Sequence, residues 1–201
     1  MRKIGCILLA TVMLICAFTV LPVHGEMGLY DNVIRLHVLA ASDSEADQAL
    51  KLQVRDAVLA YTEPLLQGVT DRAEAEELLR AAIPELEAVA LQTVRENGSL
   101  DGVCVTLGQE RYPTREYEQL AFPAGEYLSL RVQIGKAAGQ NWWCVLFPPL
   151  CMTAAVDRSQ TEATCLAAGL TGEQYRIIAD TDSTKYKLRF KFLEVAEGLL
   201  G

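Results

Sequence analysis

The hydrophobic pattern of this chain changes its period at Gly98, and this change limits the possible folds more than any other feature. Before Gly98, apolar residues recur every three or four positions, which is the spacing of amphipathic helices. After Gly98, short β-branched and aromatic runs bounded by glycine and proline are typical of strands. The predicted helices cover 47–61, 71–82 and 84–97, and the predicted strands cover 102–108, 126–135 and 141–147.

A further strand is predicted at 33–40, where alternate residues form one wholly apolar face. The segment 152–183 has weak periodicity and many small residues, so we expect a long loop there. Residues 184–200 alternate as a strand would but also carry a helical stripe, and their helix formers favour a C-terminal helix. The sequence therefore predicts a single α+β domain with an N-terminal strand, a layer of about three helices, an antiparallel sheet and a closing helix.

The first 25 residues have the layout of an export segment. Arg2 and Lys3 precede an uncharged run at 4–21, and Pro22 then ends any helix. This layout is typical of a signal peptide, and the run is also long enough to remain as an N-terminal membrane anchor. In either case the basic N-terminus stays in the cytoplasm. We therefore expect residues 26–201 to form one extracytoplasmic domain.

Charge and missing motifs exclude several classes of function. The formal net charge is −8 and no cluster of Lys and Arg occurs, so the chain lacks the positive surface that nucleic acids require. No phosphate-binding glycine loop, GxSxG turn or CxxC pair is present. His37 is the only histidine outside the export segment, and a packed histidine is the usual explanation in a strand. We therefore expect no enzyme activity, catalytic residue, metal site or cofactor.

Four cysteines follow the export segment, namely Cys104, Cys144, Cys151 and Cys165. Outside the cytoplasm they permit three pairings. Cys144 and Cys151 are the best local pair, because the Pro148-Pro149 turn between them brings the ends of the segment together. Four buried reduced thiols are the alternative.

The segment 141–151, NWWCVLFPPLC, is the strongest candidate for a partner-binding site. Adjacent strand residues point to opposite faces, so Trp142 and Trp143 cannot both enter one core without a bulge. The outward ring either anchors an interface or packs under a loop or helix. The candidate contact residues of this segment are Trp142, Trp143, Phe147, Pro148 and Pro149.

Three blocks of the chain, 33–59, 122–135 and 141–151, resemble the stage II sporulation protein R family in residues, order and spacing. The resemblance implies a specific role. Proteins of this family are made in the forespore of endospore-forming bacteria and exported into the space between the two membranes. There they activate a membrane-embedded aspartic protease, which cleaves the pro-sigma-E precursor in the mother cell.

The resemblance implies that the chain is a ligand and that its partner, the protease, carries the catalytic carboxylates. It supplies no established binding residues, and Arg35 and His37 are weaker candidates for the contact than the tryptophan segment. The chain would contact a membrane only through residues 1–25, if they are not cleaved. Two other classes stay open, an extracytoplasmic hydrolase of cell wall or peptide and a membrane-anchored structural or adhesion module.

Overall fold

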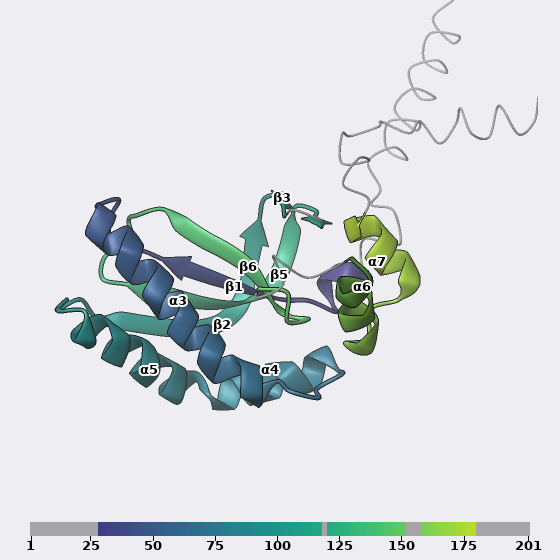
Figure 1. Cartoon of the computed structure of the whole chain (residues 1–201), viewed down its shortest axis with the longest axis horizontal. Helices are drawn as coiled ribbons and strands as arrows, with labels where there is room; N and C mark the ends of the chain where they lie inside the picture. The colour runs from purple at the N-terminus through teal and green to yellow at the C-terminus, as the bar shows by residue number, and fades with distance from the viewer. Residues whose placement is uncertain (1–27, 118–119, 152–157, 180–201) are drawn as a thin grey trace, which may run out of the picture.

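The computed structural model describes residues 28–117, 120–151 and 158–179. Within these ranges the chain forms one α+β domain, a sheet with a layer of helices on one face (Figure 1). The fold class is therefore confirmed. The predicted export segment and the predicted C-terminal helix at 184–200 lie outside the described residues. None of the described helices is long and apolar enough to cross a membrane.

The helical layer forms where the apolar period predicts it. Ser44 caps the first helix by accepting a hydrogen bond from the backbone N–H three residues further on, and Asp71 caps the second in a similar way. The third helix ends before Gly98, whose positive φ of 76° lets the chain turn toward the sheet. These helices are α3 (Glu45–Leu65), α4 (Arg72–Ala81) and α5 (Ile83–Glu96).

Four strands form a mixed sheet in the order β2-β5-β1-β6. The pairing of β1 with β5 is parallel and the other two pairings are antiparallel, so the prediction of an antiparallel sheet is wrong for one pairing. Parallel strands need a long connection between them, and the helical layer lies in the chain between β1 and β5. The strands are β1 (Ile34–Leu39), β2 (Val103–Tyr112), β5 (Gly125–Ile134) and β6 (Asn141–Phe147).

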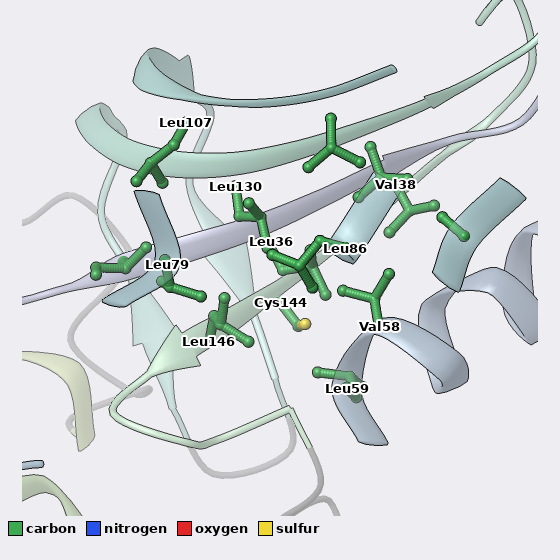
Figure 2. Close-up of a cluster of buried hydrophobic side chains, with 14 of the residues drawn as sticks. Leu36, Val38, Val58, Leu59, Leu79, Leu86, Leu107, Leu130, Cys144 and Leu146 are labelled. Carbon is green, nitrogen blue, oxygen red and sulfur yellow. The ribbon is translucent and has the colours of Figure 1, made fainter. Parts of the chain in front are cut away.

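β1 lies at the centre of the fold. The sequence predicts a half-buried strand, but all six of its residues are buried. β1 is an inner strand, with β5 along one edge and β6 along the other. Its Ile34, Leu36 and Val38 belong to the core between the sheet and the helices. Figure 2 shows Leu36 and Val38 facing side chains of the helices, among them Val58 and Leu86.

A second apolar cluster covers the opposite face at one end of the sheet. Cys165, Tyr175 and Ile178 enter this cluster from two short helices, so the expectation of a long loop over 152–183 is wrong for the described part of that range. Helices of two or three turns give little periodicity to detect. The elements over this end are β3 (Arg115–Glu116), β4 (Ala121–Phe122), α6 (Arg158–Ala167) and α7 (Gly172–Ala179).

Truncating the central strand should be costly. Leu36 is 0% exposed, so Leu36→Ala should lower the free energy of unfolding by about 2–5 kcal/mol. Leu100 is 88% exposed, and Leu100→Ala should change it by no more than about 0.5 kcal/mol. Equilibrium unfolding in urea measures both. Equal effects of the two changes would contradict the placement of β1.

Candidate functional site

The two adjacent tryptophans point to opposite faces of the sheet. Trp142 pairs with Val38 and packs at the margin of the helix-side core, where the guanidinium carbon of Arg55 lies 4.2 Å from its ring centre. Trp143 pairs with His37 and belongs to the cluster on the other side. We call that side, away from α3, α4 and α5, the outer face. Each ring is half-buried, so each covers a different surface.

Strand register places four side chains in one row across the outer face. Thr106 of β2 pairs with Arg131, Arg131 pairs with His37, and His37 pairs with Trp143. The exposed residues of this row and the next one are Thr106, Cys104 and Asn141, and we call the two rows the open half of the outer face. The second row contains Cys104, Gln133, Leu39 and Asn141.

His37 is the centre of a polar network on this face. Its Nδ1 lies 2.8 Å from Oε1 of Glu110, and Nε of Arg131 lies 3.8 Å from the same oxygen. Gly108 and Ser129, which pair with each other, have little or no side chain. Their small size leaves room for Glu110 to extend along the sheet to His37.

Burial lowers the pKa of His37 below its usual 6.5, and this effect outweighs Glu110 and Asn141, which act in the opposite direction. The imidazole is therefore uncharged at neutral pH. A neutral ring has one N–H, and the short contact assigns it to Nδ1, which donates to the carboxylate of Glu110. The contact is thus a hydrogen bond rather than an ion pair.

Aromatic stacking fixes the orientation of these groups. The rings of His37 and Trp143 are nearly parallel, with centres 3.6 Å apart. Tyr112 meets Trp143 edge-on with ring centres 4.5 Å apart, and the guanidinium carbon of Arg115 lies 5.3 Å from the centre of Trp143. Such contacts add about 0.5–1.5 kcal/mol each beyond the area that they bury. Trp143 is therefore held in one position at the margin of the open half.

Arg35 is fully buried and forms no ion pair with any described residue. Its Nε donates to the carbonyl of Cys144 over 3.1 Å, and its Nη2 donates to the hydroxyl of Tyr117 over 2.8 Å. Cation–π contacts partly offset the cost of burying the charge. Arg35 therefore joins β1, β6 and the β3–β4 hairpin from inside. The rings around its guanidinium, with centres 4.6–5.9 Å away, are those of Tyr112, Tyr117, Phe122 and Tyr127.

Buried polar atoms without a hydrogen-bond partner gather on this same face. Among the described residues seven such atoms occur, and five of them lie around the outer face. An unsatisfied buried polar atom costs about 1–3 kcal/mol, so a concentration of them needs an explanation. Because these atoms are buried, a partner docked on the face cannot reach them directly. The five are Arg35 Nη1, His37 Nε2, Glu110 Oε2, Arg115 Nε and Arg131 Nε.

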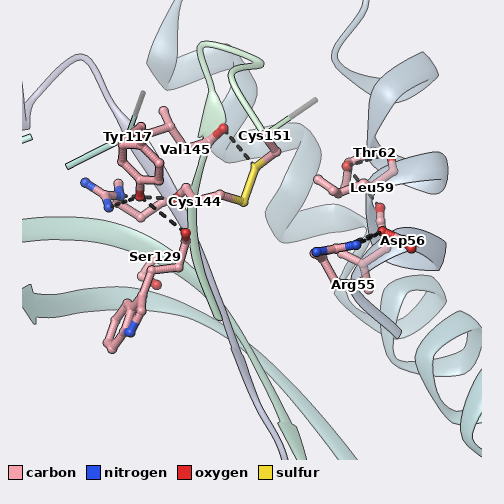
Figure 3. Close-up of a disulfide and its surroundings, with 12 residues drawn as sticks. Arg55, Asp56, Leu59, Thr62, Tyr117, Ser129, Cys144, Val145 and Cys151 are labelled. Atoms are coloured by element: carbon pink, nitrogen blue, oxygen red, sulfur yellow. Dashed lines mark hydrogen bonds and ion pairs between the residues drawn. A yellow bond between two sulfur atoms is a disulfide. The ribbon is translucent and has the colours of Figure 1, made fainter. Parts of the chain in front are cut away.

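The predicted disulfide between Cys144 and Cys151 is present, with Cα atoms 5.4 Å apart. It ties the end of β6 to the following turn, and Figure 3 shows Cys151 beside the carbonyl of Val145. The backbone N–H of Leu150 donates to that carbonyl over 3.2 Å. A covalent bond and a backbone hydrogen bond therefore close the turn. The other two cysteines that the structure describes, exposed Cys104 and buried Cys165, are free thiols.

The predicted contact residues form two groups, one buried and one with exposed surface. Those buried in the domain serve its packing and present no surface to a partner: Arg35, His37, Phe147 and Pro148. Those with exposed surface are Trp142, Trp143 and Pro149. Among the described residues no group of His, Cys, Asp and Glu could hold a metal ion.

Sequence reasoning missed Glu110, Arg115 and Arg131. Alternation along 103–112 puts Glu110 on the face opposite Val105, so its orientation was available from the sequence. Its meeting with His37 was not, because that depends on the parallel pairing of β1 with β5.

Comparison with known proteins gives the family. The family model described as "Stage II sporulation protein R" matches residues 30–157, more than half of the chain. The chain belongs to the stage II sporulation protein R family. The matched range contains all of the sheet, including the open half of the outer face, and the disulfide-closed turn.

One curated relative in this sporulation family is Stage II sporulation protein R of Bacillus subtilis (strain 168). It is 40% identical to the chain over 133 residues, which are 66% of this chain and 58% of the relative. The chain therefore matches less than two thirds of the length of that relative. No solved structure matches the chain.

The stability of the domain should decrease in mild acid because of His37. In the unfolded chain this group titrates near 6.5, and in the folded domain its pKa is lower. Between these two values the unfolded state binds more protons, so the free energy of unfolding falls as the pH drops below about 6.5. His37→Gln should remove that part of the decrease.

Urea unfolding between about pH 5 and 8 measures the effect as the difference between the original chain and His37→Gln. Taking the difference between the two free energies of unfolding removes the contribution of the carboxylates, which titrate in both proteins. If the original chain instead gained stability over the variant on acidification, the ion pair with Glu110 would outweigh burial.

Proposed function

We propose that this chain is an exported signalling protein of endospore formation. Its partner would be a membrane-embedded aspartic protease, which the chain activates and which then cleaves the pro-sigma-E precursor in the mother cell. Membership of the family supports this proposal, as does the export segment predicted at 1–25. The proposed location is the space between the forespore and mother-cell membranes.

The observation that carries the proposal at the level of the molecule is the open half of the outer face. It combines an immobilised aromatic ring, Trp143, with exposed polar residues and with the partly exposed side chains of Arg115 and Arg131. Aromatic and arginine side chains are enriched at the centre of protein interfaces. We therefore assign the contact with the protease to this half-face.

Activation requires that the chain bind the active state of the protease more tightly than the inactive state. Moving a protease from mostly inactive to mostly active requires a preference of roughly 10⁴-fold, or about 5.5 kcal/mol. A rigid ligand loses little conformational entropy on binding. The stack of His37, Trp143 and Arg115 is already ordered by contacts inside the domain, which suits it to this task.

The hydrolase alternative has one feature in its favour, the pair formed by His37 and Glu110. A histidine that is oriented by a carboxylate activates a nucleophile through its other ring nitrogen. Nε2 of His37 has no hydrogen-bond partner among the described residues, so no hydroxyl or thiol of this part of the chain is placed to act. The pair is better explained as a support for Trp143.

Reconstitution in a bacterium that does not sporulate tests the proposal. The chain would be co-expressed with the candidate protease and the sigma-factor precursor, with and without residues 1–25, and precursor size followed on a blot. The proposal expects shortening only with the exported chain. An exported and folded chain that leaves the precursor intact would overturn it.

The two tryptophans should behave differently in this assay. Trp143→Ala should abolish precursor processing while the exported domain stays folded, because it removes the aromatic anchor of the proposed contact. Trp142→Ala is the matched control on the opposite face. It should lower the melting temperature through loss of core and Arg55 contacts, with processing in proportion to the folded protein that remains. The reverse pattern would place the contact on the helix side.

A further inference from the structure

Two arginines flank the aromatic surface on the outer face. Arg131 lies in the row with His37, and its side chain is 40% exposed. Arg115 reaches over Trp143 from β3. We propose that the open half of the outer face binds an acidic loop of the partner protein, with Arg131 and Arg115 holding its carboxylates. This inference rests on the proposed function, because the partner is the protease named there.

Both arginines have donor groups that the domain itself does not use. The Nε atom of each is buried, yet neither has a hydrogen-bond partner within the described residues. The contact of Arg131 with Glu110 is 3.8 Å long, which exceeds a hydrogen bond. A guanidinium presents its N–H groups as a rigid fork that matches a carboxylate. The buried Nε atoms are out of reach of a partner, so a carboxylate would bind the outer N–H groups of the two guanidiniums, whose side chains are partly exposed.

Charge favours an acidic partner at this place. The chain has a formal net charge of −8, so most of its surface repels an acidic segment. The acid that pairs with Arg131 is Glu110, and its Oε1 also accepts a hydrogen bond from His37. The hydrogen bond from the uncharged His37 leaves the charge of Glu110 in place, so the two arginines exceed this acid by one positive charge. Such an arrangement sets the orientation in which an acidic partner docks.

The surrounding rings prepare Arg115 for this contact. Trp143 has His37 stacked on it and Tyr112 against it edge-on, so its position is fixed from two sides. Arg115 packs on that fixed ring. A guanidinium that is already ordered loses less entropy when it binds than a free surface arginine does.

Anionic lipid headgroups would offer similar chemistry, but the arrangement favours a protein. Membrane-binding segments carry clusters of four to eight projecting basic residues. Here two arginines have recessed Nε atoms, and both lie on a sheet face with Glu110 close by. Such a surface suits a single inserted loop better than a plane of headgroups.

The test uses the full chain carrying Arg115→Gln and Arg131→Gln together. Titration against the detergent-solubilised protease should show that affinity falls by about tenfold or more, since two charge-assisted contacts are lost. The matched control is Arg111→Gln. Arg111 follows Glu110 on β2, points to the opposite face and has an 84% exposed side chain. This change should leave affinity unchanged, and urea unfolding verifies that all variants fold.

Reversing the charge at one arginine is a second test of the proposal. Arg131→Glu should abolish binding, and a Lys substitution at one acid of the extracytoplasmic loops of the protease should restore it. Equal binding by the double Gln variant and the original chain would overturn this inference, while activation by both would leave the proposed function standing. If the original chain neither binds nor activates the protease, both fail.

Vesicles that contain phosphatidylglycerol distinguish a membrane from a protein partner. The proposal expects that replacing Arg115 and Arg131 does not change how much of the chain binds to these vesicles. Vesicle binding that is lost in the double variant, with protease binding unchanged, would overturn the proposal in favour of a lipid surface.

Discussion

The buried guanidinium of Arg35 is the interaction on which the outer half of this domain depends. It lies between the sheet and the β3–β4 hairpin, bonded to the carbonyl of Cys144 and to the hydroxyl of Tyr117 and surrounded by aromatic rings. Removing it would leave those partners unpaired in a closed space, which is more costly than the net value of the contacts. Because Arg35 joins β1 to β6 and to the β3–β4 hairpin, it sets the position of Trp143 and Arg115. A buried residue therefore holds the proposed contact surface in position.

The fold separates stability from recognition. The helices pack on one face of the sheet and contribute the larger apolar core, whereas the open half of the other face has exposed residues at Cys104, Thr106 and Asn141. This division explains why Trp142 and Trp143, adjacent in sequence, are expected to differ in effect. One faces the helix-side core and the other faces the proposed partner.

Local pattern was enough to predict much of the architecture. The three helices before Gly98, the change of structure at that glycine and the disulfide between Cys144 and Cys151 are set by nearby residues, and the structure contains each of them. The parallel pairing of β1 with β5 depends on residues about ninety positions apart, so periodicity could not reveal it. The meeting of Glu110 with His37 and the burial of Arg35 follow from that pairing. The sequence showed which residues were unusual, but not which of them meet.

Site-specific photo-crosslinking is the measurement that tests the central claim most directly. A crosslinking amino acid at Thr106, which is exposed on the open half, is compared with one at Glu85, which is exposed on α5. Both chains would be exported in cells that contain the membrane protease. The account predicts a covalent product with the protease from position 106 and none from position 85. A product from position 85 alone would contradict the outer face as the signalling surface.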